Sequence, residues 1–188
     1  MDGYKLDDDD DPAQVPPPRL IVPVGWLVAL SLLLGVALRL VVHLSARALW
    51  IDEAMIALNL VERDFAGLLE PLDWDQGAPV LWLLLMRAVV VLAGTDELIL
   101  RLPSLVAGVL TLPLLLRVAW TYVGKLDALM TVTVMSLLPL HVYQSSELKP
   151  YASDALATAL ALLAFTVAAR HLRGLDDDVH PDQYDGDW

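Results

Sequence analysis

Two adjacent carboxylates, Asp52 and Glu53, follow directly after the first long apolar stretch, in the sequence ALWIDEAM (residues 48–55). Charge this close to a membrane-spanning segment is costly, so it is usually either solvated at the surface or placed there for chemistry. A carboxylate can act as a general base, and its hard oxygens suit Mg²⁺ or Mn²⁺. A simpler alternative is that both charges complement the N-terminus of a helix, and the local pattern alone favours that alternative.

Two further polar stretches carry groups that could join this site. One is DWDQGAP (residues 73–79), where Asp75 precedes a proline that suits the first turn of a helix. The other is YQSSELKPYASD (residues 143–154), which contains Glu147 and Lys149. Taken separately, each stretch has a simpler interpretation. Asp75 is then a charge at a helix terminus, and Glu147 and Lys149 pair with each other in a surface turn. Three such stretches on one face of a membrane would instead surround an active site.

The elements that position these stretches are membrane helices. The chain has 188 residues, 57% of them hydrophobic, and a mean hydropathy of +0.58, which is too apolar for an ordinary soluble domain. Several apolar stretches approach or exceed the roughly 20 residues that cross a bilayer. The sequence therefore predicts an all-α integral membrane protein, a polytopic helical bundle. Its apolar segments are at about 20–44, 79–93, 98–119, 126–142 and 152–169.

The second apolar segment, 79–93, is short for a span and has Arg87 in its middle. We expect it to stand on or dip into the outer leaflet, which leaves four full spans. Both tails are then cytoplasmic, and Lys125, Arg170 and Arg173 lie inside, in keeping with the positive-inside rule. Arg47 and Arg63 lie outside in this topology, so the charge bias is incomplete. The polar stretches at 45–78 and 143–154 then share the outer face.

The first outer loop contains a segment without proline or glycine, residues 51–65, which predicts a helix lying along the membrane interface. Asp52, Asn59 and Arg63 fall seven and four residues apart, so they share one face of that helix. Trp50 precedes the helix and suits the interfacial aromatic belt.

The net charge of −12 is concentrated in two tails, 1–19 and 171–188, which we expect to be disordered. The first contains an aspartate run at 7–11 and a proline-rich stretch at 12–18. The absence of a basic surface argues against nucleic acid as a partner. The absence of cysteine excludes disulfides and thiolate metal sites. Residues 20–44 are longer than the apolar region of a signal peptide, so we expect a retained first span.

Taken in order, four short motifs resemble the N-terminal part of the polytopic GT-C glycosyltransferases. The similarity is greatest to the branch of dolichyl-phosphate-mannose-protein mannosyltransferases and aminoarabinose transferases, and it covers about residues 20–170. The motifs are WIDE (50–53), DQGAP (75–79), LRLPSLVAG (100–108) and SELKPY (146–151).

The resemblance implies transfer of a sugar from a polyprenyl-phosphate carrier to an acceptor hydroxyl, with inversion. It implies Asp52 as the general base, with Glu53 as a second catalytic carboxylate. Asp52 and Asp75 match the positions that would hold a divalent metal, Mg²⁺ or Mn²⁺. The implied compartment is the prokaryotic cell membrane, with the active-site loops on the outer face.

Substrate binding is implied for Asp75, Glu147, Lys149 and Tyr151, with Lys149 balancing the lipid phosphate. The family usually has arginine at the position of Lys149, and lysine lacks the bidentate geometry of a guanidinium. Membrane lipid and the polyprenyl-phosphate-linked sugar are therefore the expected partners.

The family's chains run to several hundred residues, and the motifs found here all belong to the front of its pattern. We therefore expect a fragment or split product, which a second chain or an oligomer would complete. The alternative from another class is a non-catalytic membrane scaffold or partner subunit that retains the motifs as fold determinants. A transporter is less favoured, because the charges within long spans, Arg39 and Arg101, lie nearer the ends.

Overall fold

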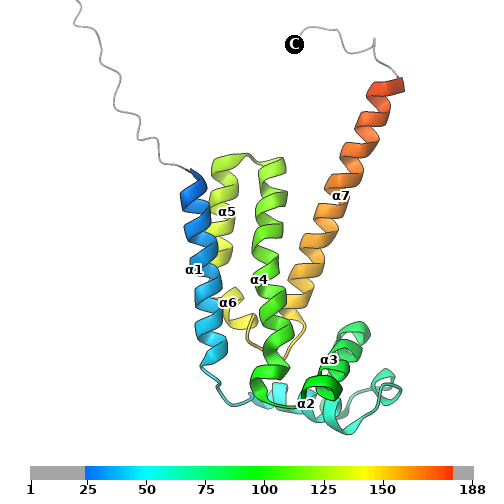
Figure 1. Ribbon diagram of the computed structural model, residues 1–188. Helices are drawn as coiled ribbons and strands as arrows, with labels where there is room; N and C mark the ends of the chain where they lie inside the picture. Colours follow the sequence, from blue (N-terminus) through cyan, green and yellow to red (C-terminus); the bar gives the residue numbers. More distant parts are fainter. Residues whose placement is uncertain (1–23, 180–188) are drawn as a thin grey trace, which may run out of the picture.

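The computed structural model describes residues 24–179, with side chains to residue 171, and in this part of the chain it is all-helical (Figure 1). The predicted tail at 1–19 and the segment 180–188 lie outside the described residues. The elements are α1 (Val24–Leu44), α2 (Ile51–Glu62), the short 3-10 turns η1 (Gly67–Leu69) and η2 (Asp73–Asp75), α3 (Val80–Ala93), α4 (Glu97–Tyr122), α5 (Lys125–Leu137), α6 (Pro139–Gln144) and α7 (Tyr151–Val179).

Three of these helices, α1, α4 and α7, are long and apolar enough to cross a membrane, which confirms the prediction of an integral membrane protein. α1 packs on α4 and α5, and α4 packs on α5 and α7. α1 begins at the end of the bundle where α4 ends and α5 begins, whereas α7 begins at the opposite end (Figure 1). Large apolar side chains such as Leu33 and Phe165 are exposed on this bundle, as a lipid-facing surface requires.

The predicted span at 126–142 is divided into α5 and α6 at Leu138. Pro139 has no N–H to offer the carbonyl of Met135, one turn earlier. The guanidinium of Arg39, buried on α1, fills this gap: it donates to the carbonyl oxygens of Met135 at 3.1 Å and Ser136 at 3.3 Å. A positive charge from one membrane helix thus caps the C-terminus of another.

Two glycines allow the bundle helices to approach one another closely. A Cβ at Gly35, on α1, would lie 2.7 Å from Ser136 Oγ and 2.9 Å from a methyl group of Leu112. A Cβ at Gly108, on α4, would overlap the side chain of Ser145, directly after α6. Ser145 Oγ in turn accepts from Arg39 Nε at 3.1 Å. Small residues therefore fix the position of the loop that follows α6.

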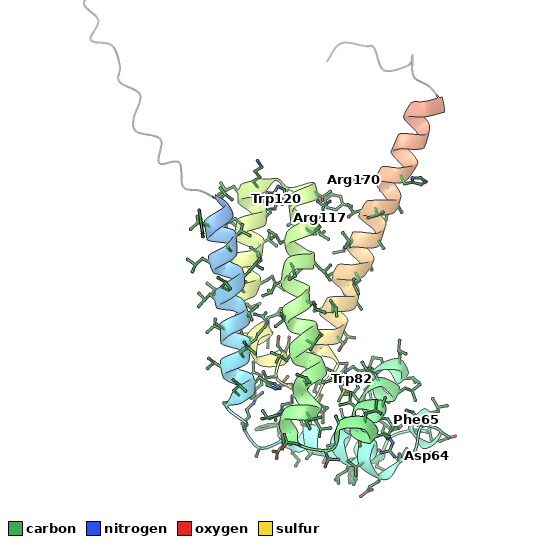
Figure 2. All side chains as sticks on the ribbon, viewed as in Figure 1. Asp64, Phe65, Trp82, Arg117, Trp120 and Arg170 are labelled. Atoms are coloured by element: carbon green, nitrogen blue, oxygen red, sulfur yellow. The ribbon has the colours of Figure 1, made fainter. Side chains whose placement is uncertain are left out.

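At the other end of the bundle, α2 and α3 form a layer with an apolar core of its own, and Leu100 of α4 and Leu148 close it. Trp82 of α3, labelled in Figure 2, belongs to this core, where it is 5% exposed. Arg87 Nη1 donates to the carbonyls of Leu60 at 2.8 Å and Val61 at 3.3 Å. The charge that made α3 unsuitable as a span therefore caps the last turn of α2.

The helix predicted at 51–65 is correct in type but ends at Glu62. Arg63 adopts an extended conformation, with φ −99° and ψ 147°, and its side chain turns back to the loop. The segments predicted at 98–119 and 152–169 are longer in the structure. α7 continues past residue 170 to Val179, so the prediction of a disordered tail is wrong for residues 171–179, which extend the last helix.

Candidate functional site

The carboxylate of Glu53 is 2% exposed, and all four of its hydrogen bonds stay within the protein. Its Oε1 accepts from Arg101 Nε at 3.0 Å and from the N–H of Leu148 at 2.7 Å. Its Oε2 accepts from Arg101 Nη2 at 2.6 Å and from the N–H of Trp50 at 2.9 Å. The bond to Trp50 is one half of a capping box that starts α2. Glu53 therefore joins α2, α4 and the loop before α7.

Electrostatics keep this buried carboxylate ionised. Burial alone would raise the pKa of Glu53, but the Arg101 guanidinium and the N–H groups of Leu148 and Trp50 outweigh burial, so the pKa lies below its ordinary value. The pair is bidentate, the geometry in which a charge-assisted hydrogen bond is strongest. We define these groups, together with Arg47, as the closed corner.

Arg47 completes the closed corner from the end of α1. Arg101 Nη1 donates to the Arg47 carbonyl at 2.5 Å, so α4 fixes the backbone before α2. The Arg47 side chain donates to the carbonyl of Ser146 at 3.0 Å and stacks on the ring of Tyr143, 3.8 Å from its centroid. Segments about 100 residues apart in sequence are thereby held together.

The first loop is pinned to α2 by two more polar side chains. The Asn59 carboxamide oxygen accepts from the N–H of Asp73 at 3.0 Å. Arg63 pairs with the Asp73 carboxylate at 2.8 Å and donates to the carbonyls of Gly67 and Pro71. The predicted shared face is therefore incomplete, because Arg63 follows the end of α2, but Asn59 and Arg63 both hold the loop at Asp73.

Asp52, in contrast, is exposed in the first turn of α2 and makes no side-chain hydrogen bond to residues 24–171. Asp75 is also exposed, and it follows an exposed tryptophan. Trp74 and Asp75 both have positive φ, 58° and 54°. This conformation costs about 1–2 kcal/mol per residue for an ordinary side chain and is most unusual for tryptophan. Such strain gathers where a chain must present a functional group.

Lys149 connects the second and third polar stretches. Its ammonium donates to Gln76 Oε1 at 3.2 Å, and the Gln76 amide group lies 3.6 Å from the sulfur of Met55, on α2. An ammonium has three N–H donors, so others remain for a ligand. We define Asp52, Asp75, Gln76 and Lys149 as the open rim.

Glu147 and Tyr151 flank the open rim. Glu147 is half-buried, and burial followed by repulsion from Glu53 raises its pKa, although Arg47 and Lys149 offset part of the effect. Tyr151 is 48% exposed at the first residue of α7. The structure thus assigns opposite environments to the predicted site residues: Glu53 is enclosed, whereas Asp52, Asp75 and Tyr151 face outward.

A metal site of three protein ligands is not assembled here. Within the described residues, no three His, Asp or Glu side chains come together in a way that could hold an ion. Asp52 and Asp75 are the pair that the sequence predicted as metal ligands. Mg²⁺ commonly uses one or two carboxylates with water and phosphate oxygens, so the remainder of its shell would have to come from outside the chain.

Arg101 and Gln76 belong to the site, although no role was predicted for either residue from the sequence. Arg101 lies in the motif LRLPSLVAG (100–108), and an arginine inside an apolar span requires a buried partner. That requirement limits the partner of Arg101 to the few carboxylates predicted on the outer face, and Glu53 is one of them. Nothing in the sequence indicates the contact between Gln76 and Lys149, because it depends on the strained turn at 73–75.

Comparison of the chain with known protein families, with curated proteins and with solved structures gives no match.

Proposed function

We propose that the chain is a membrane glycosyltransferase of the GT-C type, or the N-terminal module of one, acting on a polyprenyl-phosphate sugar. The observation that carries the proposal is the environment of the two adjacent acids. Glu53 is fully hydrogen-bonded and organises the loops, while Asp52, in the first turn of the same helix, is exposed and makes no side-chain hydrogen bond to the described residues. One carboxylate positions the site and its neighbour remains available as a base.

In the proposed reaction, Asp52 accepts the proton of the acceptor hydroxyl as its oxygen attacks the anomeric carbon. The bond between that carbon and the phosphate oxygen breaks on the opposite face, and polyprenyl phosphate leaves with both electrons. Lys149, already oriented by Gln76 at 3.2 Å, offers its other N–H groups to the leaving phosphate. Glu147 and Tyr151 flank the sugar, and Asp75 completes the rim.

The prenyl chain needs an apolar path that starts near the rim. Two adjoining cavities, of about 270 and 380 Å³, share Leu85 and Ser153 and run between α3, α4 and α7. The smaller one is bordered by Pro79 and Asp154, close to the polar stretches, and the larger one is lined almost entirely by apolar side chains. This path supports a lipid-linked donor rather than a soluble nucleotide sugar.

Asp52 and Asp75 are the residues that would bind a divalent metal in the proposed reaction. Mg²⁺ or Mn²⁺ held there would neutralise charge on the donor phosphate. If it is required, EDTA abolishes transfer and added Mg²⁺ or Mn²⁺ restores it.

The activity test is sugar transfer from a radiolabelled polyprenyl-phosphate sugar by membranes that contain the full chain. We expect Asp52→Asn to lower the rate at least about a hundredfold, the usual contribution of a general base. Glu62→Gln is the matched control, because Glu62 is exposed on the same helix and outside the motifs. Wild-type membranes that are active, combined with an Asp52→Asn variant of equal activity, remove Asp52 from this role.

The donor path has its own test. Ala157 lines the smaller cavity and is exposed, so Ala157→Phe would fill the path. Ala168 is exposed on the same helix but lines none of the described cavities near the rim, so Ala168→Phe is the control. We expect a raised KM for the donor in the first variant and an unchanged KM in the second.

The proposed topology has four crossings, with α5 and α6 together forming the third, the polar stretches outside and both tails in the cytoplasm. The chain has no cysteine, so single cysteines give a clean readout. We expect Asp64→Cys to react with an impermeant maleimide from outside intact cells and Lys125→Cys to react only after permeabilisation. Labelling of both from one side excludes this topology.

A second candidate function is a non-catalytic scaffold or partner subunit. It is favoured by Glu53 itself, because a motif residue whose every hydrogen bond serves the fold needs no catalytic explanation. Co-purification with a stable partner chain, in a protein without transfer activity, would select it.

A further inference from the structure

A polar cavity lies at the end of the bundle opposite the open rim, between the C-terminal part of α4 and α7. Its volume is about 240 Å³, several times the roughly 30 Å³ that one water occupies in the liquid. It is lined by Thr121, Tyr122, Thr166, Ala169 and Arg170. The lining therefore combines three hydroxyl-bearing side chains with one arginine, between two membrane helices.

The height of this cavity matches a membrane surface. Arg170 comes 19 residues after Tyr151, the first residue of α7, which is about 28 Å along a helix axis. Arg117 comes 20 residues after Glu97, the first residue of α4, or about 30 Å. The hydrocarbon layer is about 30 Å thick, so both arginines reach the level of the lipid headgroups.

One cation, Arg170, lines the cavity, and a second, Arg117, lies one helical turn before the lining residue Thr121 on α4. Arg117 and Arg170 are exposed, and neither makes an ion pair with a described side chain. Figure 2 shows both arginines at this end of the bundle, where the axes of α4 and α7 diverge. The hydroxyls of Tyr122 and Thr166 share a hydrogen bond of 3.0 Å across the gap, which keeps polar groups on both walls.

We propose that this cavity binds the headgroup of an anionic glycerophospholipid from the cytoplasmic leaflet. A guanidinium is a group that holds a phosphodiester well, and the Tyr122 hydroxyl, which accepts a hydrogen bond from Thr166, keeps its own proton to donate. Basic pockets between membrane helices on the cytoplasmic side bind such headgroups, and a cation close to the bound headgroup adds about a factor of five to the affinity. The acyl chains would lie along the exposed apolar surface of α7, so lipid, which is abundant at this depth, is the occupant rather than free phosphate.

The test is the amount of lipid that stays with the full chain after extraction from vesicles of equal parts phosphatidylcholine and phosphatidylglycerol, measured by mass spectrometry. We expect phosphatidylglycerol to be enriched, and Arg170→Gln to retain roughly fivefold less of it. Lys125→Gln is the matched control: it removes one exposed cation at the same end, outside the cavity lining, and should retain the wild-type amount.

Tyr122→Phe serves as a second variant, in case Arg170→Gln does not yield a monodisperse protein, and should lose a smaller share of the same lipid. Equal losses in Arg170→Gln and Lys125→Gln would mean unspecific surface attraction and would overturn the proposal. Retention unchanged in both would overturn it as well. Displacement of phosphatidylglycerol by inorganic phosphate would assign the site to the free anion and contradict the lipid source.

Discussion

The closed corner and the open rim are built from the same polar stretches, yet they differ in how their charges are satisfied. In the closed corner, Glu53 and Arg101 are almost fully buried and hydrogen-bonded to each other and to the backbone. In the open rim, Asp52 and Asp75 are exposed, and the backbone of Asp75 is strained. The difference shows that two adjacent acids at a membrane surface can have different environments. One acid fixes the loops through hydrogen bonds, and the next stays exposed and available to a ligand.

The largest expected effect comes from breaking the closed corner at Arg101. Arg101→Met leaves Glu53 buried without its cation, and we expect the free energy of unfolding to fall by about 3–5 kcal/mol. Arg117→Met is the control on the same helix, because Arg117 is exposed, and it should change stability by less than about 0.5 kcal/mol. Detergent-denaturant titration of the purified proteins measures both. Similar losses in the two variants would show that the ion pair is not what holds the corner.

A smaller effect is expected at Gly108, whose missing side chain leaves room for Ser145 in the loop after α6. Gly108→Ala would drive a methyl group into Ser145 and should lower the free energy of unfolding by about 1–3 kcal/mol. Gly25→Ala is the control, since a Cβ at Gly25 meets nothing within 4 Å. It should be neutral or slightly stabilising because alanine favours the helix. An equally stable Gly108→Ala protein would contradict the close approach of α4 and α6.

Low pH should destabilise the closed corner, because protonation of Glu53 removes its ion pair with Arg101. Because the pKa of Glu53 in the folded state lies below the ordinary value of 4.5, its pair stabilises the protein fully above pH 4.5. That contribution is lost as the pH falls through the depressed pKa. We expect the protection factor of the Leu148 N–H against hydrogen exchange, taken relative to the intrinsic rate at each pH, to fall below pH 4.5, ahead of the protection factors in α5. Protection that is independent of pH in this range would contradict the ionised pair.

The smallest effect is expected at Glu147, where the sign is reversed. Its pKa is raised, so the folded state favours the protonated acid, and this preference is lost as the pH rises through the raised value. Glu147→Gln should therefore raise the thermal unfolding temperature slightly at pH 7 and leave it unchanged at pH 4. A lower unfolding temperature at pH 7 would mean that the charge of Glu147 is used in the fold.

Apolar run length and breaker residues were sufficient to predict the helices, because a bilayer leaves the backbone few alternatives. The division of the segment 126–142 was not predicted, since an internal proline can also be tolerated within a membrane helix. Its position depends on Arg39, which comes from a helix almost 100 residues away. The candidate acids were found from motif and charge, but their different roles were not. Burial of Glu53 and exposure of Asp52 depend on which side of α2 meets α4, and adjacent residues point in different directions on a helix.

The central claim, that Glu53 holds the fold while Asp52 does not, is tested most directly by comparing Glu53→Gln with Asp52→Asn in one unfolding experiment. Glu53→Gln should lose about 3–5 kcal/mol, because Arg101 stays buried without an anion. Asp52→Asn should lose no more than about 1 kcal/mol, the value of a charge in the first turn of a helix. Equal losses, or a larger loss for Asp52→Asn, would contradict the account.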